Sequence, residues 1–154
     1  MAFELHLDTE TVEHVRPAPA LIVSPDAELL EVMSLMRRER MGCVLVCRDG
    51  VLEGLFTERD ALGLMAVTAD WEVSISRVMT RNPVTVLVSD TVGAAIQKMS
   101  QGGYRRLPVV DNHRRAVGLL KVSTILDYLV QHFPAFVYNL PPNPHHAMQS
   151  REGA

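Results

Sequence analysis

Residues 54–60 read GLFTERD, and residues 118–124, 64 positions further along the chain, read GLLKVST. Each segment begins with a glycine and two large apolar residues, which is typical of the end of a buried strand. Polar residues follow and suit the start of a helix. Two such strand-to-helix junctions in one chain indicate an internal duplication.

The correspondence extends to the N-terminal side of both junctions. The apolar run at 44–46 matches the run at 107–109, 63 positions on. Before each run lies an amphipathic helical stripe of three apolar residues: Leu29, Met33 and Met36 in the first copy, and Val92, Ile96 and Met99 in the second. Residues 21–62 and 86–126 therefore share one strand, helix, strand, strand, helix pattern.

A duplicated βαββα unit predicts a mixed α/β (α+β) fold in which two similar motifs pack about a pseudo-two-fold axis, with paired clefts at their seam. A copy of about 60 residues buries too little surface to be very stable alone. We therefore expect the 154 residues to form one interlocked domain rather than two independent ones.

Turn residues and periodicity divide the chain further. Pro17 and Pro19 argue against a regular helix in the N-terminal arm. The predicted organisation is an arm at 1–19, a first motif at 20–70, a connector at 71–79, a second motif at 80–133 and an extended Pro-rich tail at 134–154. Strands are expected at about 20–23, 43–47, 51–56, 106–110 and 116–120, and helices at about 26–40, 57–69, 89–103 and 121–133. We expect the tail to dock on a surface through Phe136, Tyr138 and Leu140.

Composition narrows the classes of function. The formal net charge is −3, which disfavours a general nucleic-acid or anionic-membrane binder. No apolar run approaches the roughly 20 residues that span a bilayer, and the acidic N-terminus has no signal-peptide core. These features predict a cytoplasmic protein.

The cysteines, histidines and motifs of the sequence give little indication of metal binding or catalysis. Cys43 and Cys47 lie on one face of a strand, about 13 Å apart by strand rise, too far for a disulfide, so we expect two small buried thiols. His145 and His146 lie in the tail without a cysteine or carboxylate at ligand spacing. No nucleophile or phosphate-loop motif is present. We expect neither a metal site nor an enzyme.

Thr57 and Asp60 form the most suggestive polar pair. They lie three residues apart in the first turn of a helix, so their side chains share a face. A hydroxyl beside a carboxylate is well placed to bind a diol such as a ribose. The same spacing also suits a capping box, in which each side chain binds the other residue's backbone N–H. Spacing alone favours the cap.

Several motifs, taken together and in their order, resemble the CBS-domain family. They are the repeated βαββα pattern, the 54–60 segment, MTRNPVTV at 79–86 and RLPVVD at 106–111. The chain is similar to a tandem CBS pair, also called a Bateman module, over about residues 12–133. The resemblance implies a disc-like pair that often dimerises and that binds AMP, ADP, ATP or S-adenosylmethionine between its motifs.

The resemblance also implies roles for individual residues. Thr57 and Asp60 match the pair that holds the ribose, and Leu55 would add an apolar wall. The opening strand of the second motif would supply Pro83 and Val84 against the base. Further ligand contacts are implied for three adjacent residues: Tyr104 in the cavity, and Arg105 and Arg106 near phosphates. Alternatively, Tyr104 is an aromatic residue at the edge of the core, and Arg105 and Arg106 form the solvated start of a strand. Because side chains alternate along a strand, we expect only one of the two arginines to reach a ligand.

The second copy departs from this pattern, because Lys121 stands where Thr57 stands and Thr124 where Asp60 stands. Its cleft is therefore either empty or occupied differently, and one competent site per chain is the simplest expectation. The prediction is a regulatory module that binds an adenosyl nucleotide, with no obligatory cofactor, and signals to a separate effector. The main alternative is a homodimeric interaction module without nucleotide binding.

Overall fold

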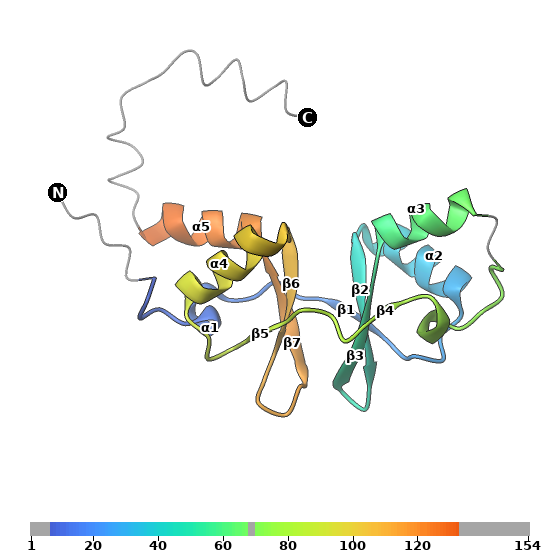
Figure 1. The fold of residues 1–154 in the computed structure, drawn as a ribbon, viewed down its shortest axis with the longest axis horizontal. Helices are drawn as coiled ribbons and strands as arrows, with labels where there is room; N and C mark the ends of the chain where they lie inside the picture. Colours follow the sequence, from blue (N-terminus) through green and yellow to red (C-terminus); the bar gives the residue numbers. More distant parts are fainter. Residues whose placement is uncertain (1–6, 68–69, 133–154) are drawn as a thin grey trace, which may run out of the picture.

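The computed structural model describes residues 7–67 and 70–132. Figure 1 shows two hairpins, β2–β3 and β6–β7, side by side in the middle of the molecule; α2 and α3 flank the first, and α4 and α5 flank the second. The elements are α1 (Val12–Val15), β1 (Leu21–Val23), α2 (Leu29–Glu39), β2 (Cys43–Arg48), β3 (Val51–Thr57), α3 (Glu58–Ala66), η1 (Ile75–Arg77), β4 (Thr80–Arg81), β5 (Val86–Leu87), α4 (Val92–Gly102), β6 (Arg106–Val110), β7 (Ala116–Lys121) and α5 (Val122–His132). The predicted mixed α/β fold of two βαββα motifs is confirmed.

The two hairpins share one register. In the first sheet β1 runs parallel to β2 and β2 antiparallel to β3, and β5, β6 and β7 repeat this arrangement. The register shifts after Val46 in the first hairpin and after Val109, 63 positions on, in the second. The second turn is one residue longer, so the offset becomes 64 beyond it. The sequence offsets therefore reflect two superimposable units.

The segment that leads into the second copy pairs with the first copy. β4 lies antiparallel to β3, with Thr80 opposite Leu55. The predicted opening strand of the second copy is thus wrong for Pro83 and Val84, which lie between β4 and β5 in no strand. A short extended segment gains backbone hydrogen bonds wherever a strand edge is free, and proline has no N–H to donate.

A similar exchange occurs on the other side of the molecule. The backbone of Ala18, which precedes the first copy, forms two hydrogen bonds with Leu119 of β7, at 2.8 and 2.9 Å. Each copy is therefore joined to the other by the segment that precedes it. The hairpin tips add a third connection, because Leu52 donates its N–H to the carbonyl of Arg114 at 3.0 Å.

Apolar residues fill the space behind each sheet and between the sheets. Val44 and Val46 of β2 face the helices of the first copy, whereas Leu45 faces the second copy. This alternation explains why five consecutive residues of β2 are buried. The group between the copies, here called the seam cluster, consists of Cys43, Leu45, Cys47, Leu52, Val110 and Leu119. Both cysteines are buried and free, and they share one face of the strand.

The N-terminal arm is more structured than the prolines suggested. Residues 12–15 form the short helix α1, so the expectation of no regular helix at 1–19 was wrong. The helix ends at Arg16, which adopts a left-handed conformation (φ 58°) directly before Pro17. Val12 is fully buried among the core residues of the second copy, and its burial stabilises a turn too short to persist alone.

The other helices lie within their predicted ranges but begin one to three residues later. Turns precede the helices at the residues where they were expected to begin. Asp90, for example, accepts a hydrogen bond from the N–H of Leu87 at 2.9 Å, ahead of α4. The predicted tail and its docking residues lie outside the described residues.

Candidate functional site

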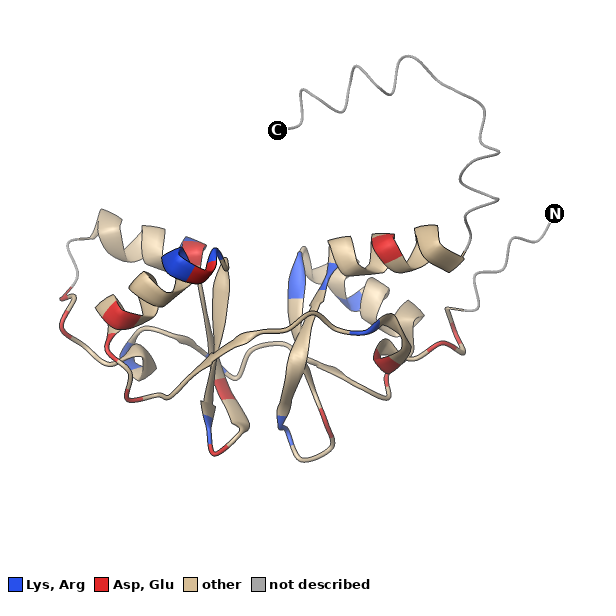
Figure 2. Cartoon of the chain, turned by 180° about the vertical axis from the view of Figure 1, so that it is seen from behind, with Lys and Arg blue, Asp and Glu red and all other residues tan. Residues whose placement is uncertain are grey.

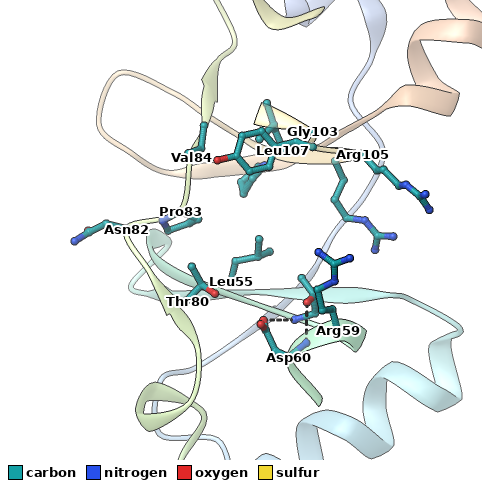
Figure 3. Close-up of a pocket in the computed structure, with 14 residues that line it drawn as sticks. Leu55, Arg59, Asp60, Thr80, Asn82, Pro83, Val84, Gly103, Arg105 and Leu107 are labelled. Carbon is teal, nitrogen blue, oxygen red and sulfur yellow. Dashed lines mark hydrogen bonds between the residues drawn. The ribbon is translucent and has the colours of Figure 1, made fainter. Parts of the chain in front are cut away.

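A cleft of about 610 Å³ opens at the seam between the two copies (Figure 3). All eight residues singled out from the sequence line it: Leu55, Thr57, Asp60, Pro83, Val84, Tyr104, Arg105 and Arg106. Six further residues line it that sequence reasoning missed: Arg59, Thr80, Asn82, Gly103, Leu107 and Pro108. The first copy, the second copy and the segment between them all contribute, so the cleft exists only when both copies are packed together.

The first copy supplies the acidic wall of the cleft at the junction of β3 and α3. Thr57 accepts a hydrogen bond from the N–H of Asp60 at 3.2 Å, and Asp60 Oδ2 accepts one from the N–H of Thr57 at 3.0 Å. The capping box expected from the spacing is therefore present. It does not occupy the carboxylate, because Asp60 Oδ1 and further lone pairs can still accept hydrogen bonds. The cap fixes the direction in which the pair faces the cleft.

The second copy supplies an aromatic side chain at the opposite wall. A Cβ at Gly102 would overlap the ring of Tyr104, so the ring lies directly against the end of α4. Gly103 then takes a left-handed conformation (φ 69°) as the helix cap. The sequence indicated only a helix end at this glycine pair. The structure shows that it also places Tyr104 at the cleft.

Apolar groups cover the floor of the cleft. Pro83 is buried, while Val84 and Tyr104 remain 39% and 38% exposed. Figure 3 shows Pro83 and Leu55 between Val84 above and Thr80 below. Flat apolar and aromatic surfaces of this kind can cover the faces of a heterocyclic ring.

Three arginines reach the same cleft. Arg59 lies in the first turn of α3, while Arg105 and Arg106 lie at the start of β6. Both neighbouring arginines line the cleft, since Arg105 precedes the strand and does not obey its alternation. The expectation that only one of them reaches a ligand stays a prediction. Arg106 extends across the seam: a Cβ at Gly42 of the first copy would lie 2.5 Å from its Nη1.

Sequence reasoning missed Arg59 because it treated the residues between Thr57 and Asp60 as spacers. The sequence did indicate that Arg59 lies near the cleft, since it precedes Asp60 directly in the first turn of the helix. Thr80 and Asn82 were missed for a different reason, namely the pairing of β4 with the first copy.

The equivalent junction of the second copy lacks this chemistry. Lys121 pairs with Arg106 across the hairpin, as Thr57 pairs with Cys43. A lysine side chain cannot accept a hydrogen bond, so no capping box forms with Thr124. In the described part of the chain no carboxylate occupies the position equivalent to Asp60.

Across residues 7–67 and 70–132, no three His, Cys, Asp or Glu side chains gather in a way that could hold a metal ion. None of the helices in these ranges has the length and apolarity that a membrane crossing requires.

Comparison with known proteins identifies relatives. The sequence is 35% identical over 104 residues to the CBS domain-containing protein YhcV of Bacillus subtilis, covering 67% of this chain and 74% of that protein. It is 38% identical over 120 residues to CBSCBSPB5 of Arabidopsis thaliana, covering 75% of this chain. The match spans only 22% of the length of the Arabidopsis protein.

Solved structures share the fold. The CBS domain protein PAE2072 from Pyrobaculum aerophilum, complexed with AMP, superposes with a TM-score of 0.68 at 25% identity, over 79% of this chain and 98% of that one. The CBS domain pair of MJ0100, in complex with 5′-methylthioadenosine and S-adenosyl-L-methionine, superposes with a TM-score of 0.68 at 23% identity, over 79% and 97%. The CBS-domain family model matches residues 12–67 and 75–131. The chain therefore belongs to the CBS-domain family, as a tandem pair of CBS domains.

Proposed function

We propose that this protein is a regulatory module that binds an adenosyl nucleotide, of the group AMP, ADP, ATP and S-adenosylmethionine, in the seam cleft. Occupancy would be signalled to a separate effector protein. The observation that carries the proposal is the combination of groups in one cleft: a carboxylate and hydroxyl pair, an apolar floor and three guanidinium groups. Membership of a family of regulatory modules, and the AMP complex of PAE2072, support it.

Each group suits one part of such a ligand. Asp60, with Thr57 beside it, would accept hydrogen bonds from the ribose hydroxyls. Val84, Pro83 and Tyr104 would enclose the base, with Leu55 completing the apolar wall. The guanidinium groups, including those of Arg105 and Arg106, would bind phosphate oxygens.

Signalling requires that the ligand prefer one arrangement of the two copies. A ligand in this cleft contacts both copies at once, so it shifts their relative packing only if it binds one packing more tightly than another. The proposal includes a cytoplasmic homodimer as the unit that presents this change to the effector.

The test is thermal unfolding with and without each of the four ligands, on the wild type and on Asp60→Ala. A ligand that binds only the folded state raises the melting temperature by mass action. Asp60→Ala also removes half of the capping box, so each variant is compared with its own ligand-free melting temperature. Thr91→Ala is the matched control, because Thr91 caps α4 through the N–H of Ala94 at 3.0 Å and does not line the cleft.

A shift that persists in Thr91→Ala and disappears in Asp60→Ala supports the proposal. The absence of a shift with every ligand would contradict it and favour a homodimeric interaction module. One observation favours that second candidate: large apolar side chains are exposed along α3 and α5, namely Leu62, Met65, Val122, Leu126 and Val130.

A further inference from the structure

Three positive side chains from two different copies converge on one cleft. Arg59 comes from α3 of the first copy, and Arg105 and Arg106 come from the start of β6 in the second. Figure 3 shows Arg59 and Arg105 on the same side of the cleft, away from Val84 and Asn82. Figure 2 shows the same arrangement as basic segments at the start of α3 and at the start of β6, on either side of the seam.

None of the three arginines is neutralised within residues 7–67 and 70–132, where the ion pairs are His14–Glu10, Arg38–Glu39 and Arg48–Glu53. Other arginines at the seam hold the copies together instead. Arg114 and Arg115, at the tip of the second hairpin, donate to the carbonyls of Leu52 and Asp49, each at 3.2 Å. The three cleft arginines make no such bond to any residue that the structure describes, so their donors are available to a ligand.

Asp60 is the acidic residue that lines this cleft, and one of its oxygens already accepts the N–H of Thr57. Three guanidinium groups against one carboxylate leave the cleft with a positive excess of two charges. Like charges close together are unfavourable, and the walls of a cleft reduce the screening by water. A ligand that fills this end of the cleft must therefore be strongly anionic.

Resting on the proposed function, we infer that the cleft selects adenosyl ligands with two or three phosphates, and that Arg59 is one of the residues that bind them. Arg59 belongs to the first copy and Arg105 and Arg106 to the second, so a chain of two or three phosphates, which carries more negative charge than AMP, can bind guanidinium groups of both copies at once. S-adenosylmethionine carries a positively charged sulfonium at the equivalent distance from its ribose, and the arginines repel it.

The selectivity is confined to the first cleft. At the positions equivalent to Arg59, Arg105 and Arg106, the other cleft would present Ser123, Gly42 and Cys43. Lys121 remains as a single cation there. The contrast shows that the arginine cluster is a property of one site and not of the repeated fold.

The test is calorimetric titration of the full chain with adenosine, AMP, ADP, ATP and S-adenosylmethionine, in buffer with EDTA and about 0.1 M salt. We expect ADP and ATP to bind about 10-fold or more tightly than AMP and S-adenosylmethionine, the size expected for charged hydrogen bonds. Arg59→Gln should weaken ATP binding about 10-fold and leave adenosine binding unchanged. Arg77→Gln, which removes the same charge from an exposed residue outside the cleft, should change neither.

The outcomes separate the inference from the proposed function. If AMP or S-adenosylmethionine binds as tightly as ATP, and binding still depends on Asp60, the phosphate selectivity is overturned while the nucleotide site stands. If Arg59→Gln and Arg77→Gln weaken ATP binding equally, Arg59 acts only through net charge, and its role in the site is overturned. If no adenosyl ligand binds, both the inference and the proposed function fail.

Discussion

The two strand-to-helix junctions of this chain have the same backbone and different chemistry. In both, the first residue of the first hairpin strand pairs with the last residue of the second strand, and a helix begins immediately afterwards. In the first copy the junction presents Thr57 and Asp60 to a cleft, whereas in the second it presents Lys121 and Thr124. The backbone is the same in both copies because the fold is determined by apolar residues and strand pairing, not by these polar residues.

The residues that face the two junctions also differ between the copies. Tyr104, Arg105 and Arg106 face the first junction, and the equivalents that would face the second are residues 41–43, Met-Gly-Cys. The first copy therefore provides the carboxylate and Arg59, and the second copy provides Arg105 and Arg106. The duplication therefore repeats one backbone arrangement at both junctions, and a few polar positions distinguish the junction that lines the seam cleft.

The largest expected effect tests whether the copies remain one structural unit. Phe56 and Leu120 occupy equivalent strand positions and are both fully buried. Phe56→Ala should cost about 3–5 kcal/mol of unfolding free energy and Leu120→Ala about 2–5 kcal/mol, from lost burial and cavity formation. Because the seam cluster joins the copies, each change should shift one common transition.

The single tryptophan makes this measurable. Trp71 packs against the core of the first copy, so its fluorescence in urea reports on that copy, while far-ultraviolet circular dichroism reports on the whole chain. Leu120→Ala, in the second copy, should move both transitions together. A Trp71 transition that stays at its wild-type midpoint would show that the copies unfold independently.

The next effect tests whether the two junctions differ in ligand binding. Asp60→Ala should weaken nucleotide binding by about 10- to 100-fold, because hydrogen bonds to a charged group contribute about 1.5–3 kcal/mol. Thr124→Ala, at the equivalent position, should leave the affinity unchanged. Titration of both variants with ATP compares them directly, and an equal loss in the two would contradict the asymmetry.

A double substitution that gives the second junction the polar residues of the first tests whether the two junctions are structurally equivalent. Lys121→Thr combined with Thr124→Asp gives α5 the capping box of α3 and replaces a cation at a helix N-terminus by an anion. Both changes favour the helix, and we expect about 0.5–2 kcal/mol of added stability in urea unfolding. Ligand stoichiometry should remain one per chain, since the arginines are still missing from that cleft. No gain in stability would show that the junctions are not structurally equivalent.

The smallest expected effect is on the pH dependence of the unfolding free energy and comes from Cys47, whose equivalent in the second copy is Val110. Burial, followed by the negative charge of Glu53, raises the pKa of the Cys47 thiol. The unfolded chain therefore loses this proton first, and the unfolding free energy should fall as pH rises above the ordinary thiol pKa of about 8.5. Urea unfolding at several values up to about pH 9.5 measures the slope.

Cys47→Val places the residue of the second copy in the first and should reduce that slope. The pKa of Tyr128 is also raised by burial, and this group adds its own loss of stability at higher pH. An unchanged slope in Cys47→Val would assign the alkaline destabilisation to Tyr128 or to other groups.

Much of this fold was predictable because the repeat and the apolar periodicity are local properties of the sequence. Five strands were placed within about a residue, β4 (Thr80–Arg81) and β5 (Val86–Leu87) were not placed, and Thr57 and Asp60 were recognised as a pair at a helix start. The partner of each strand is not encoded locally, however. β4 pairs with the first copy because β3 offers a free edge, and neither Thr80 nor Arg81 indicates that choice.

The eight predicted cleft residues do meet at one cleft, and their ligand roles remain predictions. Arg59 was missed because its exposed side chain in a helical turn looks like any solvated cation in the sequence. The packing of the copies brings it to the same cleft as Arg105 and Arg106, and Figure 3 shows it on the same side as Arg105. Helix α1 was missed for a similar reason, because burial of Val12 and Val15 against the second copy stabilises it.

The stoichiometry of ATP binding to the full chain tests the asymmetry of the two clefts most directly. Calorimetric titration of the wild type, with Asp60→Ala and Thr124→Ala alongside, gives both the number of sites and the copy that provides them. We expect one site per chain, with an affinity about 10- to 100-fold weaker in Asp60→Ala and unchanged in Thr124→Ala. Two equally occupied sites per chain, or one site whose affinity is unchanged in Asp60→Ala, would contradict this asymmetry.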